Sequence, residues 1–315
     1  YFPAWPDVVQ LNVFNASLRK EIVDTVSGIA KQCDGVRCDM AMLTMNKIFQ
    51  RTWGVRAGQM PCSDYWSNLI TAIKSKFQDF LFIAEAYWDM ELELQQQGFD
   101  FCYDKKLYDR MEHCRAEDIR LHLLADMSYQ DRLIRFIENH DEPRAASSFP
   151  KEKAKMAAVI FSTLPGAKLF HEGQLQGRKI RVPVFLGRRP EENPDYDNEK
   201  FYHALLSALD SDIFHKGVWR GCEIRGWPDN PSSRNILAWT WTNESRRNLI
   251  IVNFSEIHSQ AMIKVPWDDI YGKSVQLTDL LCWEKYDRLG TDMINEGLYV
   301  DLKPWSCHFF NLNQI

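Results

Sequence analysis

Three acidic residues each follow a short run of strand-forming residues, and their types and places could support chemistry. They are Asp39 after GVRC, Glu85 after FLFIA and Asp141, which lies four residues after the run LIRFI. Because residues just past the carboxyl ends of parallel strands share one edge of a barrel, we expect the three carboxyl groups to lie close together. Such a set can divide the work of glycosidic cleavage: one carboxylate attacks the anomeric carbon, a second acid protonates the leaving oxygen, and the third stabilises positive charge on the ring. Retention of configuration would require the first two to lie about 5–5.5 Å apart.

The surroundings of Asp39 and Glu85 favour opposite protonation states. Arg37 lies two residues before Asp39, so in a strand both side chains point to the same side. A guanidinium there would keep the Asp39 carboxylate ionised and aim it. Glu85 follows an apolar run and precedes aromatic residues that include Trp88. Such surroundings would raise the pKa of Glu85, as a proton donor requires.

Polar and aromatic residues near the acids could bind a sugar. Asn139 and His140 can donate hydrogen bonds to hydroxyl groups beside Asp141. Trp88 can stack on a sugar ring, and Arg144 can contact an acceptor sugar. Each also fits a structural role: an isolated aromatic is more often core packing, and Arg144 suits a structural ion pair equally well. One acid at a strand end is usually only a loop residue, so the hypothesis depends on the three acids together.

Strand-like and helix-like segments alternate through the first two thirds of the chain. Strands are predicted at residues 35–39, 80–84, 99–103, 133–137 and 167–170. Helices are predicted at residues 15–29, 64–77, 90–97, 116–127, 151–164 and 199–209, with Asn15 as a cap and Gly98 as a helix end. Strands that alternate with helices imply βα units and a parallel sheet, which would position the acidic residues at its carboxyl edge.

The chain changes character after about residue 214. Short segments at 236–241, 248–253 and 305–310 are rich in aromatic and β-branched residues and are separated by turn residues. This pattern predicts a small antiparallel β domain at 215–315, following a catalytic domain at 1–214.

Composition excludes several classes of function. The 315 residues are 45% hydrophobic and 26% charged, with a net charge of -5 and no long basic run, which argues against a nucleic-acid partner. The sequence contains no run of about 18 apolar residues, so no membrane-spanning helix is predicted. The eight cysteines form no C-x-x-C pair, so a zinc site is unsupported, and we expect them to be mostly free and buried, as in the reducing cytoplasm.

Five segments resemble, in order and spacing, the motifs of the α-amylase family, glycoside hydrolase family 13. Residues 35–39 (GVRCD) resemble the family's G-[FV]-R-x-D motif at barrel strand four, and residues 82–86 (FIAEA) resemble its strand-five motif. Residues 136–141 (FIENHD) are similar to the F-x-x-N-H-D motif of strand seven. Residues 164–174 are similar to the strand-eight motif, and residues 11–19 (LNVFNASLR) to the stretch before strand four. Several motifs in order are far more specific than one.

The resemblance implies a (β/α)8 TIM barrel followed by an antiparallel β-sandwich. It implies Asp39 as nucleophile, Glu85 as acid/base and Asp141 as stabiliser of the transition state, with Arg37 and His140 at subsite −1. The implied activity is retaining hydrolysis of α-glucosidic bonds through a covalent glycosyl-enzyme intermediate, on an α-glucan such as starch or glycogen or on an α-glucoside. The alternatives are α-glucanosyl transfer and a non-catalytic carbohydrate-binding homologue or fragment.

The chain departs from the family pattern in three places, one of which is Glu142-Pro143-Arg144 directly after Asp141. The strand-three motif, D-x-x-x-N-H, is absent, so we expect barrel strands four to eight here and strands one to three in a missing N-terminal part of the same protein. Met42 and Leu43 stand where amylases often carry Lys-His. This substitution leaves bound calcium unsupported, and no cofactor or metal site is predicted.

Overall fold

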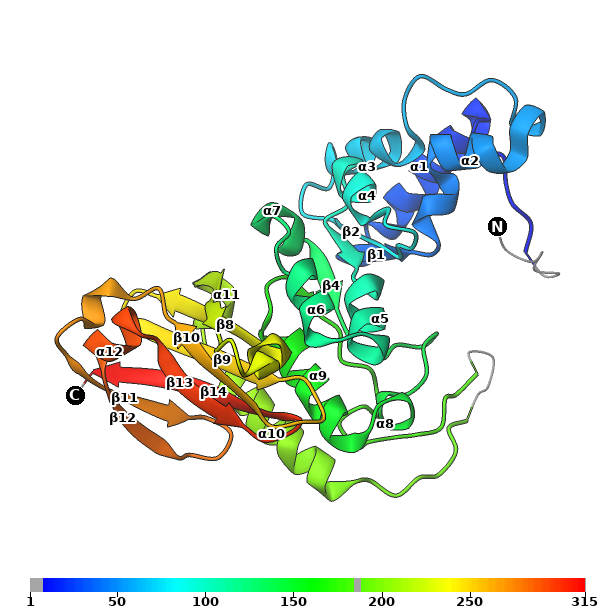
Figure 1. Ribbon diagram of the computed structural model, residues 1–315. Coiled ribbons are helices and arrows are strands. Elements are labelled where there is room, and N and C mark those ends of the chain that lie inside the picture. The colour runs from blue at the N-terminus through cyan, green and yellow to red at the C-terminus, as the bar shows by residue number, and fades with distance from the viewer. Residues whose placement is uncertain (1–7, 184–187, 315) are drawn as a thin grey trace. The chain divides into compact units, whose positions relative to one another are not determined.

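The computed structural model describes residues 8–183 and 188–314, which form two compact units. The first unit extends to Lys106 and includes Asp131–Ile134. The second comprises Leu107–Gln130 and the chain from Arg135 onward. Figure 1 labels most of the helices and strands of both units.

Parallel strands carry the acidic residues predicted for catalysis. The strand order is β1 (Gly35–Cys38), β2 (Leu81–Ala84), β3 (Phe101–Tyr103), β4 (Leu133–Arg135) and β5 (Ala167–Lys168). The pairings of β1 with β2, β2 with β3 and β3 with β4 are all parallel. The five predicted strands and the parallel α/β sheet are therefore confirmed.

Among the described residues, four α-helices lie wholly within the first unit. They are α1 (Ala16–Ile29), α2 (Asn46–Trp53), α3 (Tyr65–Lys74) and α4 (Glu91–Gln96). The predicted cap is confirmed, because Oδ1 of Asn15 accepts from the N–H of Leu18 at 3.0 Å. Gly98 follows α4 with a φ of +109°, and a Cβ there would lie 3.1 Å from Ile70. Both features favour glycine at this helix end.

Glu91, at the start of α4, is a buried acid in the first unit. It is 4% exposed, and its burial together with the charge of Asp104 raises its pKa to about 7. The folded protein therefore holds a proton that the unfolded chain releases near the ordinary glutamate pKa of 4.5. The free energy of unfolding consequently falls as the pH rises through this window.

Replacing this buried acid by its neutral isostere should stabilise the protein only at higher pH. We expect Glu91→Gln to raise the free energy of unfolding by about 2 kcal/mol at about pH 8 and to change it little at about pH 4. Urea unfolding at both pH values measures this difference. Glu93→Gln on the same helix is the control, since the Glu93 side chain is 40% exposed. Equal effects of Glu91→Gln at both pH values would contradict the prediction.

Most helices of the second unit precede its antiparallel β structure. They are α5 (Lys105–His113), which begins at the end of the first unit, α6 (Ala116–His122), α7 (Met127–Gln130), α8 (Ala145–Ser148), α9 (Lys151–Thr163), α10 (Tyr196–Leu209) and α11 (Ile213–Lys216). A further helix, α12 (Gly290–Asn295), lies between later strands of this β structure. The prediction of one helix over 116–127 is wrong at its end, because α6 stops at His122. The side-chain amide of Gln130 donates to the carbonyls of Leu123 and Ala125, at 3.0 and 2.8 Å, and so stabilises a turn there.

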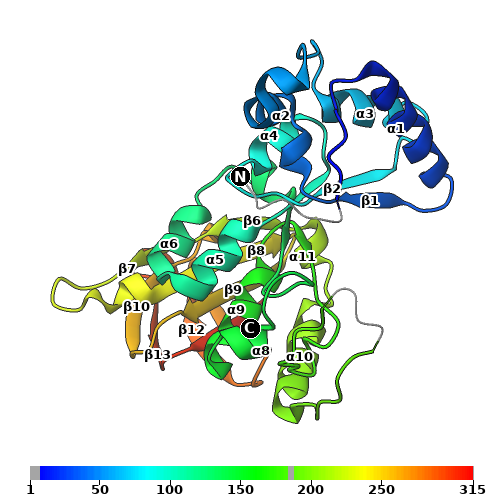
Figure 2. The ribbon, with the colours of Figure 1, turned by 90° about the vertical axis from the view of Figure 1, so that its right-hand side faces the viewer.

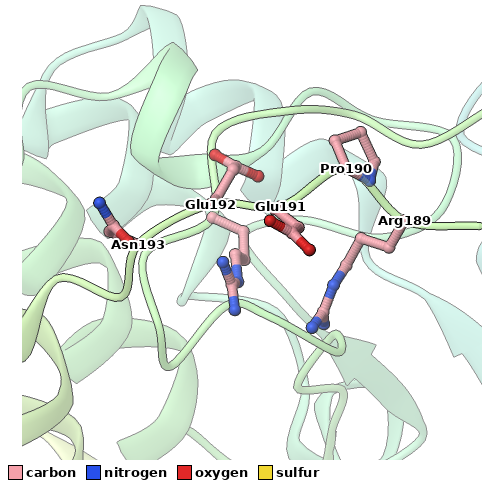
Figure 3. Close-up of a pocket in the computed structure, with 6 residues that line it drawn as sticks. Arg189, Pro190, Glu191, Glu192 and Asn193 are labelled. Atoms are coloured by element: carbon pink, nitrogen blue, oxygen red, sulfur yellow. The ribbon is translucent and has the colours of Figure 1, made fainter.

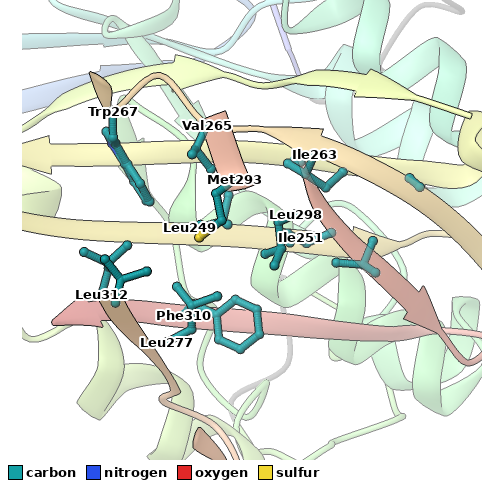
Figure 4. Packing of buried hydrophobic residues seen from close by; sticks show 14 of the residues in the cluster. Leu249, Ile251, Ile263, Val265, Trp267, Leu277, Met293, Leu298, Phe310 and Leu312 are labelled. Carbon is teal, nitrogen blue, oxygen red and sulfur yellow. The ribbon is translucent and has the colours of Figure 1, made fainter. Parts of the chain in front are cut away.

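Two antiparallel sheets in the second unit share one core. The larger has the order β12-β11-β14-β9-β8-β6 and the smaller the order β13-β10-β7. Their bounds are β6 (Val218–Gly221), β7 (Glu223–Arg225), β8 (Ile236–Asn243), β9 (Arg246–Asn253), β10 (Ser259–Lys264), β11 (Ser274–Asp279), β12 (Lys285–Leu289), β13 (Leu298–Leu302) and β14 (Ser306–Gln314). Leu249 and Phe310 of the larger sheet pack with Ile263 of the smaller one (Figure 4). The predicted antiparallel β structure is confirmed, while the division at residue 214 stays a prediction.

The cysteines only partly follow the prediction. All eight are free, as predicted, but Cys33, Cys62, Cys114 and Cys282 are exposed. The expectation of burial is wrong for these four because they lie in loops and turns between the elements. Within the ranges that the structure describes, no helix is both long enough and apolar enough to span a membrane.

Candidate active site

Asp39 and Glu85 lie beside each other at the carboxyl ends of β1 and β2. The parallel register pairs Cys38 with Ala84, so the two acids follow at equivalent positions. The N–H of Glu85 donates to the carbonyl of Cys38 at 3.0 Å, and the carbonyl of Glu85 accepts from the N–H of Ala41 at 3.1 Å. The ladder thus continues past the strand ends and fixes the two residues predicted as nucleophile and acid side by side.

One guanidinium group holds both carboxyl groups. Nη1 of Arg37 donates to Oδ1 of Asp39 at 2.6 Å, and Nη2 lies 3.1 Å from Oε2 of Glu85. The ring of Tyr103, at the end of β3, has its centroid 5.6 Å from the guanidinium carbon, a cation–π distance. The Asp39 side chain is 75% exposed and the Glu85 side chain only 6%. A ligand can therefore reach Asp39 directly, whereas Glu85 is largely shielded from water.

The pKa of Glu85 shifts in the direction that an acid catalyst needs. Burial raises this pKa, and the neighbouring Asp39 carboxyl adds to the increase, while the N–H of Met40 and the charge of Arg37 oppose it. The net result is a raised pKa, as the apolar run before Glu85 predicts. A carboxyl group that keeps its proton to higher pH can donate it to a leaving oxygen.

Met40 adopts a left-handed conformation directly after Asp39. Its φ of 44° and ψ of 47° point its N–H at Glu85, where it donates to Oε2 at 2.7 Å. The indole N–H of Trp66, on the buried face of α3, donates to the carbonyl of Ala41 at 2.7 Å and holds this turn. A non-glycine residue in this region costs roughly 1–2 kcal/mol, and such strain occurs often at functional sites. Sequence reasoning missed Met40, because its residue type carries no polar signal.

Trp88 lies on the loop that leaves Glu85. Its side chain is 39% exposed, and both Trp88 and Asp89 have positive φ values, of 62° and 59°. Asp89 pairs with Lys106 across this loop. The loop conformation leaves part of the indole accessible to a ligand.

The loop with Asp141 belongs to the second unit. Nε2 of His140 lies 3.0 Å from Oδ2 of Asp141, and the two side chains are 42% and 41% exposed. Oδ1 of Asn139 accepts from the N–H groups of Asp141 and Glu142, each at 2.8 Å. Asn139 therefore uses its side-chain oxygen to shape the turn that presents His140 and Asp141.

The two residues of a buried ion pair flank this loop in sequence: Glu138 precedes it and Arg144 follows it. Arg144 is 3% exposed and Glu138 1%, and Nη1 of Arg144 lies 2.7 Å from Oε1 of Glu138. Nδ1 of His171 lies 3.0 Å from the same oxygen, and the N–H of Ala145 donates to Oε2 at 2.8 Å. Nη1 of Arg144 also donates to the carbonyl of Glu172 at 2.5 Å. The sequence allowed two roles for Arg144, a contact with an acceptor sugar or a structural ion pair. These contacts are those of a structural ion pair. Glu138 and His171 had not been singled out.

Comparison with solved structures shows that the fold of the chain is similar to that of alpha-amylases. No family model matches the chain. The maltogenic alpha-amylase AmyB from Thermotoga neapolitana matches with a TM-score of 0.70 and 18% identity, over 97% of this chain and 68% of that structure. The alpha-amylase from Geobacillus thermoleovorans, solved with acarbose, matches with a TM-score of 0.70 and 16% identity, over 95% of this chain and 64% of that structure.

One curated relative is also similar to the chain in sequence. Alpha-amylase MalA of Haloarcula japonica is 26% identical over 269 residues, which cover 79% of this chain and 36% of that relative. The chain therefore resembles the α-amylase family in sequence as well as in fold. The chain thus spans about a third of the length of this curated relative. The family resemblance predicted from the motifs is confirmed.

The second unit also has a charged hollow of about 520 Å³ (Figure 3). It is lined by Arg178, Arg189, Pro190, Glu191, Glu192 and Asn193. Glu192 fixes one wall, since its carboxylate accepts from the N–H groups of Lys179 and Ile180 at 2.8 and 3.2 Å. Among the residues with described positions, no group of three or more His, Cys, Asp or Glu side chains could hold a metal ion.

Proposed function

We propose that the protein is a retaining α-glucoside hydrolase, which cleaves α-glucosidic bonds in α-glucans or maltooligosaccharides. The observation that carries this proposal is the single guanidinium of Arg37 bound to an exposed carboxylate, Asp39, and to a buried acid, Glu85. Two carboxyl groups with such different surroundings suit the two roles of a retaining glycosidase.

The reaction that follows from this geometry has two steps. In the first, a carboxylate oxygen of Asp39 bonds to the anomeric carbon while the glycosidic C–O bond breaks, and the proton of Glu85 passes to the leaving oxygen. In the second, the Glu85 carboxylate takes a proton from water, whose oxygen displaces Asp39 from the same carbon. Two inversions give net retention.

The other residues predicted from the sequence take supporting roles in this proposal. Asp141 stabilises the oxocarbenium-like ring, and His140 donates to a ring hydroxyl in the same subsite. Trp88 stacks on the sugar through its accessible indole. Asn139 acts by shaping the Asp141 turn, and Arg144 acts through the ion pair that anchors the loop rather than by touching an acceptor sugar.

The stereochemistry of the first product tests this function. Turnover of α-glucosyl fluoride by the 315-residue chain, followed by proton NMR, should show α-glucose before mutarotation. This substrate needs little beyond one sugar subsite, and Asp39→Asn is the control that should release no fluoride. Initial β-glucose, or no fluoride from the folded chain, would contradict the proposal. Oligosaccharides that accumulate when maltose is added would identify the enzyme as a transferase instead.

A further inference from the structure

The smaller sheet of the second unit has an outer face that is not simply polar. Alternate residues of β13 point inward and outward: Leu298, Val300 and Leu302 are buried, whereas Tyr299 and Asp301 are exposed. The inward residues belong to the core shared with the larger sheet. β10 pairs with β13 on one side and with β7 on the other, as Figure 2 shows. A tyrosine thus stands on the exposed side of this sheet.

Trp227 joins Tyr299 on this side. Their ring centroids are 6.1 Å apart with an interplanar angle of 66°, and the residues remain 38% and 50% exposed. Trp227 follows β7 at the start of a short turn, in which it forms an antiparallel bridge with Asn230. Two exposed rings in contact offer a small apolar surface to which a ligand can bind.

Hydrogen-bonding groups adjoin the rings. The side-chain amide of Asn230 donates to Oε1 of Gln260 at 2.9 Å, and the Gln260 amide donates to Oδ2 of Asp301 at 3.3 Å. Gln260 and Asp301 are cross-strand partners, so this chain of amides and carboxylate runs across the sheet beside Tyr299. These contacts fix the polar groups in place before any ligand arrives.

A hollow of about 440 Å³ borders the same network. Asn230, Ser232 and His258 contribute to its lining. His258 also lies 3.6 Å from Asp301, so the hollow and the sheet face share their polar residues. A ligand that lies on the rings can extend polar groups toward the hollow.

We propose that this surface is a second binding site for an α-glucan chain. It consists of Trp227, Tyr299, Gln260 and Asp301 and is called the aromatic face below. A glucose ring has a flat face of C–H groups and a rim of hydroxyls, which matches two rings beside amide and carboxylate groups. The choice of an α-glucan rests on the proposed function. At exposed fractions of 38% and 50%, Trp227 and Tyr299 together expose roughly 200 Å². A stable protein partner buries about 800 Å² per side. The aromatic face therefore suits one or two sugar units.

Calorimetric titration with maltoheptaose tests this site in the Asp39→Asn background, in which the glucan is not consumed. We expect Trp227→Ala and Tyr299→Ala each to weaken one class of binding about tenfold, as for anchoring aromatics in other interfaces. Trp227→Phe, which keeps a ring, should retain most of the affinity. Trp283→Ala is the matched control, because Trp283 is 71% exposed elsewhere in the second unit and should leave binding unchanged. Cellohexaose, with its β linkages, should bind the aromatic face more weakly.

The outcomes separate this inference from the proposed catalysis. When Asp39 is left unchanged, the Trp227→Ala and Tyr299→Ala variants should release fluoride from α-glucosyl fluoride at the same rate as the unsubstituted chain. Maltoheptaose binding that is unchanged in a Trp227→Ala/Tyr299→Ala double variant would overturn the inference even if fluoride release is normal. A concentration-dependent dimer that the double variant abolishes, without any change in glucan binding, would also overturn it and make the face a contact between copies. Loss of binding in the double variant supports the site even if catalysis fails.

Discussion

Glutamine in place of Glu85 is expected to lower turnover of maltotriose about 10³-fold, because the leaving oxygen then receives no proton. Fluoride needs no protonation to leave, so the first step with α-glucosyl fluoride should survive in this variant. Hydrolysis of the intermediate on Asp39 should then become slow, since no base remains to activate water. The loss therefore depends on the substrate, which distinguishes an acid/base residue from one that merely supports the fold.

Azide provides the measurement that isolates this role. An azide ion needs no base, so it should attack the Asp39 intermediate in Glu85→Gln, restore fluoride release, and yield a glucosyl azide of retained configuration. Asp39→Asn should lose turnover of both substrates, and azide should give no retained product. Equal losses on maltotriose and α-glucosyl fluoride in Glu85→Gln, without azide rescue, would show that Glu85 is not the acid/base residue.

The alternation of strands and helices was predictable because each strand reads as a short apolar run with a polar residue at its end. The contact between Arg37 and Asp39 was also predictable, since residues two apart in a strand share a side. The second contact of Arg37, with Glu85, depends on the register of β1 and β2. The sequence resemblance placed Glu85 at a neighbouring strand end, but it could not specify that Arg37 would pair with it as well as with Asp39.

Features set by distant contacts were not predictable. The left-handed turn at Met40 is held by Trp66, 25 residues away from the carbonyl that it binds. The burial of Glu138 depends on His171, 33 residues further along the chain. In the sequence Glu138 is only one polar residue in a motif, and an acid is rarely buried without such partners. Local patterns thus predicted the elements, whereas the polar contacts between them required the fold.

Removing the charge of Glu138 is the change with the largest expected effect on stability. Glu138→Gln should lower the free energy of unfolding by about 3 kcal/mol, because the buried guanidinium of Arg144 then keeps only the exposed carboxylate of Glu172, 3.9 Å away, as a counter-ion. The double variant Glu138→Gln/Arg144→Met should recover most of this loss, since no unpaired charge remains in the interior. Urea unfolding of the single and double variants measures the coupling. Asp212→Asn, which breaks an exposed pair with Lys216, is the control and should leave the unfolding midpoint unchanged.

Kinetics of the same variants show whether the ion pair also positions the catalytic loop. Residues 139–143 lie between Glu138 and Arg144, so a shift of either end would move Asp141 away from the sugar ring. If Asp141 acts only on the transition state, the double variant should recover stability while its kcat for α-glucosyl fluoride stays about tenfold low at an unchanged KM. A double variant that recovers both stability and kcat would assign the pair to folding alone. Because the two readouts respond to different properties of one loop, their divergence is the evidence that Glu138 and Arg144 serve catalysis without touching the substrate.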